Sequence, residues 1–332
     1  STILFTGPLP RPLRWVLAKN RKGPDALLHF VVCSVVSIVS SQRSFTHDLA
    51  LKGIVMRKAV CSWSLRPENT DDLVVQVQDT GVNSIQLALD PIRRANNAFE
   101  ELRVIQSAGI SVVSGMMEMI GEDYSTFDSI RKTGGVRPDE TWEMNVESAK
   151  SNALLAQQVG LSLVTFHAGF IPHDDTDPER GQMLERLSTI ADIFSAQGCD
   201  IALETGQETA DTLVEVLSDL GREDVGVNFD PANMILYGMG DPIQALDRLA
   251  PWVKQIHIKD ALGADSPGVW GTEVPAGDGA VEWDNLFELL SSHSLDVDLV
   301  IEREAGEERV RDVRIASDRI DQWLSKRDRG MA

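Results

Sequence analysis

The sequence predicts an α/β fold of the (β/α)₈ TIM-barrel class with an N-terminal extension outside the core. From Met56 onward, short apolar segments alternate eight times with helix-like segments, and this alternation implies a parallel sheet. Four of the apolar segments end in a carboxylate or a histidine, and a barrel gathers the carboxyl ends of its strands at one mouth. The competing doubly wound sheet would need a glycine-rich dinucleotide turn after the first strand, and residues 61–67 contain no such turn.

The first half of the barrel is predicted from runs of β-branched residues and from residues that limit helices. The expected strands are 59–65, 84–89, 110–117 and 161–166, and the expected helices are 68–79, 91–108, 140–159 and 178–196. Pro91 in a first turn and Gly109 just past a last turn mark the limits of the second helix. Residues 121–139 interrupt the rhythm with Gly134-Gly135, and we expect this long connection to form part of the pocket or a lid.

The second half follows the same pattern and completes one barrel over residues 57–327. The expected strands are 201–204, 225–229, 253–258 and 297–301, and the expected helices are 208–220, 241–249, 283–290 and 307–324.

Residues 1–56 form the expected extension. Up to Arg57 the chain has eight Lys or Arg against two Asp, whereas the whole chain has a formal net charge of -20. The apolar run 27–39 is too short for a membrane span but has the length of the apolar region of a signal peptide. We therefore expect a cytoplasmic protein with an extension that does not join the fold. The alternatives are export, if residues 21–41 act as a signal, and a structured addition to the barrel.

Composition narrows the range of partners. The acidic charge argues against nucleic acid and against an anionic membrane, because phosphate groups require clustered Lys and Arg. The three cysteines show no Cys-x-x-Cys spacing, so neither a zinc ribbon nor a disulfide scaffold is indicated. The expected partner is a small molecule, and the composition is also compatible with assembly into a homo-oligomer.

Four strand ends carry candidate metal ligands: Glu204, Asp230, His257 and Glu302. Because a barrel brings the carboxyl ends of its strands together, residues 26, 27 and 45 positions apart can converge there. Two Glu, one Asp and one His form a mostly oxygen site for one divalent ion, Mn²⁺ in the first place, with Mg²⁺ and Co²⁺ as alternatives. Glu302 is preferred over Glu304 because it directly follows the apolar run.

Further residues are candidates for substrate binding. Lys259 shares strand parity with His257 and so lies beside the metal site, unless it pairs with Asp260. His167 ends the fourth strand, and Asn233 follows Asp230 by three residues, where it could hold a substrate hydroxyl or orient the aspartate.

Trp270 lies in the loop after the seventh strand. A flat aromatic wall with polar groups around it suits a sugar ring. The alternative is a tryptophan that covers an edge of the core.

Several short segments, in this order and spacing, resemble a known family. They are Phe166-His-Ala-Gly169, Ala202-Leu-Glu-Thr-Gly206, Asn228-Phe-Asp-Pro-Ala-Asn233, Ile256-His-Ile-Lys-Asp260, Gly277-Asp-Gly279 and Val300-Ile-Glu-Arg-Glu304. From about Met56 to Lys326 the chain resembles the sugar phosphate isomerase/epimerase family of xylose-isomerase-like barrels, which includes ketose 3-epimerases and inosose dehydratases. The resemblance implies that the four ligands hold one divalent ion and that Glu204 and Glu302 also exchange protons with the substrate.

The chain departs from the family at substrate-contacting positions. Asn233 stands where the family often has His, and residues 261–264 lack the Arg of the epimerases. The expected activity is a metal-dependent isomerase or epimerase of a sugar or related polyhydroxy ketone that works through an enediolate. The alternative is a lyase or dehydratase of a keto-sugar, keto-glycoside or keto-inositol with the same metal site.

Overall fold

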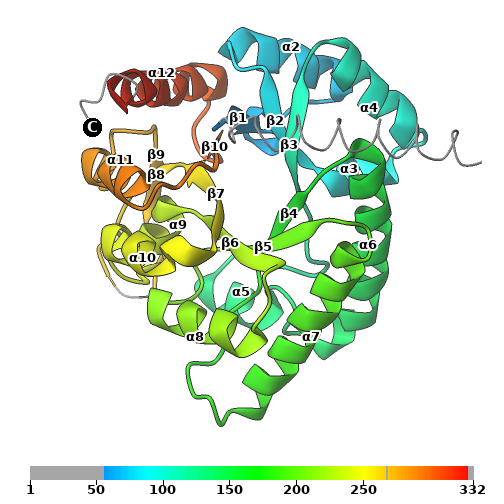
Figure 1. Ribbon diagram of the computed structural model, residues 1–332, viewed down its shortest axis with the longest axis vertical. Coiled ribbons are helices and arrows are strands. Elements are labelled where there is room, and N and C mark those ends of the chain that lie inside the picture. The colour runs from blue at the N-terminus through cyan, green and yellow to red at the C-terminus, as the bar shows by residue number, and fades with distance from the viewer. Residues whose placement is uncertain (1–55, 267, 328–332) are drawn as a thin grey trace, which may run out of the picture. The chain divides into compact units, whose positions relative to one another are not determined.

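Eight parallel strands close into a barrel with helices around the outside (Figure 1). The structure is a computed structural model, and it describes residues 56–266 and 268–327. The strand order around the ring is β1-β10-β7-β6-β5-β4-β3-β2. This closed order confirms the predicted (β/α)₈ fold. The expected extension lies outside the described residues, apart from Met56.

The barrel strands are short, as buried parallel strands usually are. They are β1 (Lys58–Cys61), β2 (Ser84–Ala88), β3 (Ser111–Met116), β4 (Leu163–Phe166), β5 (Asp200–Glu204), β6 (Val225–Phe229), β7 (Val253–Ile258) and β10 (Asp298–Ile301). A separate antiparallel pair, β8 (Asp260–Leu262) and β9 (Thr272–Val274), follows β7.

The helices cover the outer face of the ring. The α-helices are α2 (Thr70–Thr80), α3 (Leu89–Arg94), α4 (Ala98–Ser107), α5 (Phe127–Thr133), α6 (Asp139–Val159), α7 (Pro178–Ser195), α8 (Ala210–Leu220), α9 (Pro231–Tyr237), α10 (Pro242–Leu249), α11 (Trp283–Ser292) and α12 (Arg309–Arg327). Two 3₁₀ turns, η1 (Ser62–Leu65) and η2 (Ala250–Trp252), complete the set.

Two local predictions were wrong in detail. The predicted helix 91–108 is two helices, because the Asn97 side chain accepts a hydrogen bond from the Glu100 backbone and starts α4 afresh. The predicted strand 59–65 ends at Cys61 and continues as η1. The connection 121–139, predicted to form part of the pocket or a lid, contains α5, which Thr126 starts with a reciprocal capping box to Ser129.

The barrel interior beneath the strand ends is a polar network rather than an apolar core. Gln86 donates to Thr165 (2.8 Å), Ser114 donates to Gln255 (2.5 Å), and Gln255 donates to Asn228 (3.2 Å). All five side chains are buried. Because each of these side chains has a hydrogen-bond partner, the network fixes the orientation of the side chains directly beneath the strand ends.

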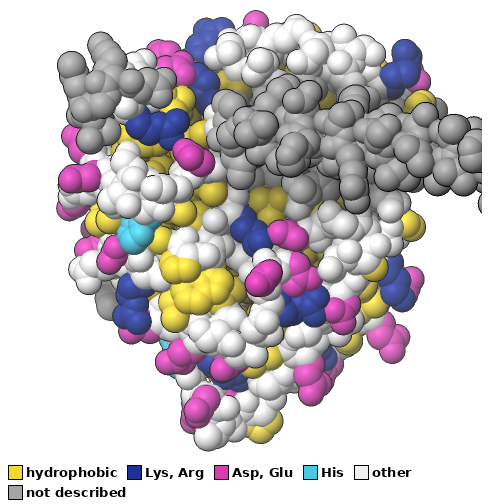
Figure 2. Space-filling view, in the orientation of Figure 1, with side chains coloured by type: hydrophobic (Ala, Val, Ile, Leu, Met, Phe, Trp, Pro, Cys, Tyr) yellow, Lys and Arg dark blue, Asp and Glu magenta, His cyan; other side chains and the backbone are white. Residues whose placement is uncertain are grey.

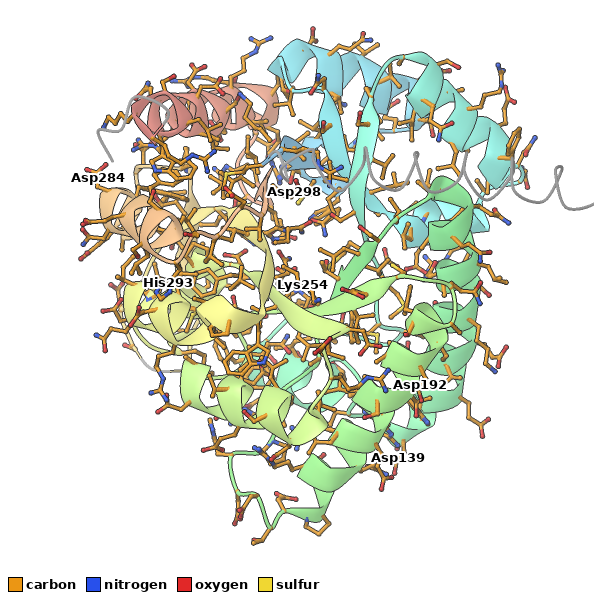
Figure 3. The ribbon with its side chains drawn as sticks, in the orientation of Figure 1. Asp139, Asp192, Lys254, Asp284, His293 and Asp298 are labelled. Carbon is orange, nitrogen blue, oxygen red and sulfur yellow. The ribbon has the colours of Figure 1, made fainter. Side chains whose placement is uncertain are left out.

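The outer surface carries interspersed acidic and basic side chains (Figure 2). Figure 3 shows Lys254 and Asp298 at the ring of strands, whereas Asp139 and Asp192 belong to outer helices. Across the described ranges, none of the helices has the length and hydropathy needed to cross a membrane.

Candidate metal centre

The four predicted ligands meet at one point. Glu204 is the last residue of β5, Asp230 and Glu302 directly follow β6 and β10, and His257 lies in β7. These strands are neighbours in the ring, and one ligand atom from each residue lies within 4.8 Å of the others. All four side chains are buried. The structure therefore brings together the residues that the sequence analysis placed at a common mouth.

The polar neighbours of His257 fix the orientation of its ring. Its Nε2 lies 2.8 Å from Gln86 Oε1 and 3.0 Å from Asn228 Nδ2. Nδ1 faces three carboxylates, at 3.6 Å from Glu204, 3.7 Å from Asp230 and 3.4 Å from Glu302. Burial disfavours the charged ring, but attraction to the surrounding acidic groups outweighs burial and raises the pKa of His257 well above its ordinary value. A second polar group that orients the ring is the arrangement found around metal-binding histidines.

The donor set fits a divalent cation. His257 Nδ1 and Asp230 Oδ2 are buried and have no hydrogen-bond partner among the described residues. Buried polar atoms without partners are rare in native proteins. Three carboxylates and an imidazole within 4.8 Å of one another would satisfy both atoms by binding one ion.

Lys259 supplies positive charge beside this cluster. Its Nζ donates to Glu302 (2.8 Å), Glu304 (2.6 Å) and Asn233 (3.2 Å). Burial opposes its ionisation, but attraction to Glu302 and Glu304 outweighs burial and raises the pKa of Lys259 well above its ordinary value. The alternative pairing with Asp260 is not what the structure shows.

The two glutamates are held ionised and oriented by different partners. Burial disfavours their charge, but His257 and His167 lower the pKa of Glu204, and Lys259 and His257 hold the pKa of Glu302 well below its ordinary value. Trp63 Nε1 donates to Glu302 Oε1 at 2.8 Å. Both glutamates can therefore accept a proton at neutral pH.

Asn228 and Asn233 orient the side chain of Glu204. Asn228 donates to Glu204 Oε2 (3.1 Å) and Asn233 donates to Glu204 Oε1 (2.9 Å). The Asn233 backbone also donates to Asp230 Oδ1 at 2.9 Å, which caps α9. Since both ends of its amide contact residues of the centre, Asn233 orients the ligands as well as facing the cavity.

A cavity of about 600 Å³ adjoins the centre. Its walls come from the ends of β2 and β3 and from the segments that follow β1, β3, β4, β6, β8 and β10. The lining residues are Trp63, Ala88, Met116, Met117, Glu118, Glu122, Tyr124, His167, Asn233, Leu236, Tyr237, Trp270 and Glu304. The volume is in the range of pockets for small organic ligands.

Besides Asn233, two predicted substrate contacts line this cavity, His167 and Trp270. The His167 Nε2 atom lies 3.7 Å from Glu204 Oε1. Trp270 packs against Phe127 and Tyr237, with ring centroids 4.6 and 4.9 Å apart. Trp270 thus covers an edge of an aromatic cluster and also forms a wall of the cavity, so both interpretations of this residue describe part of its environment.

Several residues of the site were missed by the sequence analysis. Trp63, Gln86 and Asn228 contact Glu302, His257 and Glu204. Strand parity places Asn228 beside Asp230 and could have identified it. Trp63 lies in η1, directly after β1, and Gln86 lies in β2. Neither strand carries a candidate ligand, so the signal for these residues is the ring closure that brings β1 next to β10.

The Asp260 carboxylate organises the loop between β9 and α11. It accepts from the backbone of Gly277 (2.7 Å) and Gly279 (3.2 Å) and from Trp283 Nε1 (2.9 Å). This explains why an aspartate that follows Lys259 directly in sequence does not pair with it.

The sequence matches a known family over most of the barrel. Residues 74–324 match the family model described as "Xylose isomerase-like TIM barrel". A xylose isomerase domain protein from Planctomyces limnophilus is 30% identical, with 82% of this chain and 96% of that chain covered and a TM-score of 0.71. The predicted relationship to xylose-isomerase-like sugar isomerases and epimerases is confirmed.

Similar proteins include both an epimerase and a dehydratase. An L-ribulose 3-epimerase structure is 16% identical, with 83% of this chain and 97% of that chain covered and a TM-score of 0.65, a likeness of fold. A 3-dehydroshikimate dehydratase from Bacillus anthracis is 26% identical over 129 residues, which are 37% of this chain and 46% of that protein. The chain spans less than half the length of the curated relatives that it matches.

Proposed function

Because the chain belongs to the xylose isomerase-like TIM barrel family, we propose that it is a divalent-metal-dependent isomerase or epimerase of a sugar or related polyhydroxy ketone. The observation that carries the proposal is the pair Glu204 and Glu302, two buried glutamates in one cluster with Asp230 and His257. The cluster adjoins a cavity with aromatic and polar walls that suit a sugar ring.

The residues of the centre would divide the work between binding and proton transfer. Glu204, Asp230, His257 and Glu302 would hold the ion, for which we propose Mn²⁺, with Mg²⁺ or Co²⁺ as alternatives. When bound, a divalent ion polarises a carbonyl and acidifies the neighbouring C–H bond.

Proton transfer would run between the two glutamates and the substrate. One glutamate removes the proton from the carbon beside the carbonyl to give an enediolate, and the other returns a proton. Lys259 keeps Glu302 ionised and Trp63 fixes its orientation, whereas Asn228 and Asn233 fix Glu204. Return to the same carbon on the opposite face gives an epimer, and return to the adjacent carbon gives the aldose-ketose isomer.

A dehydratase is the second candidate. The similarity to a 3-dehydroshikimate dehydratase supports it, because loss of a β-hydroxyl begins with the same proton removal beside a carbonyl. The two candidates differ in the fate of the enediolate and not in the residues that form it.

The test uses the full chain loaded with Mn²⁺ and a panel of ketoses, keto-inositols and 3-dehydroshikimate in D₂O. An isomerase or epimerase gives a product of unchanged formula that has taken up deuterium, and chelation abolishes the turnover. A dehydratase gives a product lighter by one water. Turnover that persists after chelation, or that brings no deuterium into the substrate carbon, refutes the proposed mechanism.

Variants connect the activity to the two glutamates. We expect Glu204→Gln and Glu302→Gln each to lower kcat by at least about a thousandfold, since each removes a proton acceptor while keeping the shape of the side chain. Glu307→Gln is the matched control: it lies five residues after Glu302, and its side chain is 86% exposed on the surface. Activity in either variant equal to that of the control would contradict the assignment.

A further inference from the structure

The loop after β3 is locked onto the end of β4 by two close backbone approaches. Val136 donates to the Ala168 carbonyl at 3.0 Å. Gly135 has a φ of +64°, and a Cβ at this position would overlap the backbone of Ala168 and Gly169. Only glycine accepts both the backbone conformation and the contact. The Gly134-Gly135 pair therefore holds the loop rigidly beside His167.

This anchored loop places a carboxylate in the cavity wall. Glu122 Oε1 accepts from the Gly135 backbone at 3.0 Å, and its Oε2 accepts from the Tyr124 hydroxyl at 3.3 Å. The Tyr124 ring in turn lies edge-on to His167, with centroids 6.2 Å apart. Each carboxylate oxygen has two lone pairs and uses one of them, so Glu122 keeps acceptor capacity for a ligand.

The charges around the cavity disfavour an anion. Within residues 56–266 and 268–327, no Lys or Arg lines it, whereas Glu118, Glu122 and Glu304 do. Lys259 is nearby, but its three protons are taken by Glu302, Glu304 and Asn233. A phosphate or carboxylate entering this space would meet carboxylates without a free cation to pair with.

We propose that Glu122 determines substrate specificity: its carboxylate accepts hydrogen bonds from hydroxyl groups of the substrate beside His167 and excludes substrates that carry a phosphate or carboxylate there. The substrate class is then an uncharged polyhydroxy ketone. This inference rests on the proposed function, because it takes the same cavity as the substrate site. Glu122 acts by recognition, since its backbone and tyrosine contacts lie outside the metal cluster.

The test compares matched pairs that differ by one phosphate: D-fructose with D-fructose 6-phosphate, and L-ribulose with L-ribulose 5-phosphate. Binding to the Mn²⁺-loaded full chain is measured by calorimetry for the unmodified protein, Glu122→Gln, Glu122→Asp and Glu307→Gln. Glu307 has a side chain that is 86% exposed and is not among the residues that line the cavity, so it is the matched control.

We expect the unmodified protein to bind the uncharged member of a pair more tightly. Glu122→Gln should weaken binding of that member by about tenfold, the range for loss of one charge-assisted hydrogen bond, and should strengthen binding of the phosphate. Glu122→Asp keeps the charge and should still reject the phosphate. Glu307→Gln should change both affinities by less than about twofold, because its carboxylate is exposed and lies outside the cavity.

Any of three results would overturn the inference. They are tighter binding of the phosphates by the unmodified protein, no binding of either uncharged ketose, and an affinity ratio that is unchanged in Glu122→Gln. Circular dichroism and bound-Mn²⁺ analysis of each variant establish that fold and metal centre are intact. Binding with the expected ratios but without turnover would refute the proposed function and leave the specificity assignment standing.

Discussion

Replacement of Lys259 by Met tests the electrostatics on which the centre depends. The side chain is 2% exposed, and its ammonium neutralises Glu302 at 2.8 Å and Glu304 at 2.6 Å. Without it, Glu302 remains buried with a side-chain exposure of 3%, whereas Glu304, at 52%, can regain water. Removing one partner of a buried pair costs about 3–5 kcal/mol of unfolding free energy, and the buried Glu302 places Lys259→Met in that range.

The pH window follows from the two pKa shifts. Attraction to Glu302 and Glu304 outweighs burial and raises the pKa of Lys259, so its contribution to stability is complete below its ordinary value of 10.5 and is lost as pH rises through the folded value. Lys259 and His257 outweigh burial and lower the pKa of Glu302, so its contribution is present above 4.5 and is lost as pH falls through the folded value. At pH 7 both contributions are present, and the variant should show its full loss.

Lys254→Met is the matched control, because it removes a lysine from the beginning of β7, the strand that Lys259 directly follows. Lys254 pairs with Asp200 at 2.7 Å, and their side chains are 24% and 45% exposed. Such a pair contributes about 0–1 kcal/mol. Urea unfolding at pH 7 with a chelator should therefore separate the two variants by about 2–5 kcal/mol. Added Mn²⁺ should reduce the difference in unfolding free energy between the two variants, since the ion would neutralise the same carboxylates. Equal losses in both variants would refute the reasoning.

Three further predictions follow from the site and its supporting loops. Burial raises the pKa of Asp230 to about 6, so protons should compete with the metal, and equilibrium dialysis should show Mn²⁺ affinity falling as pH drops through 6; a flat profile between pH 5 and 8 would contradict this. Burial raises the pKa of Glu208 to about 8, so the contribution of this group to the free energy of unfolding should fall by roughly 3–5 kcal/mol as pH rises from 4.5 to 8. Urea titrations of Glu208→Gln over the same pH range should lack this fall. Gly135→Ala should lose at least about 2 kcal/mol more than Gly160→Ala, because both have positive φ but only the first Cβ meets the Ala168 backbone; equal unfolding midpoints would disprove the steric account.

The four candidate metal ligands could be located from the sequence because each lies at the end of an apolar run. In a parallel barrel, a residue directly after a strand lies at the mouth of the barrel, regardless of how the connecting helices are arranged. On the same basis, Glu302 could be chosen over Glu304 as the candidate ligand. The structure places Glu302 in the cluster, whereas Glu304 lies outside it and accepts a hydrogen bond from Lys259. The division of helix 91–108 escaped prediction because the Asn97 cap interrupts an otherwise continuous helical pattern.

The sequence by itself determined the alternation of strands and helices, and with it the barrel and the positions of the ligands at its mouth. Strand periodicity and helix limits are local properties, so they can be read along the chain. Only the tertiary structure decided which partners surround each ligand: Gln86 on His257, Trp63 on Glu302, and Glu122 in the cavity wall. These contacts depend on ring closure and on the backbone approach at Gly135, which join residues far apart in sequence whose spacing carries no periodic signal.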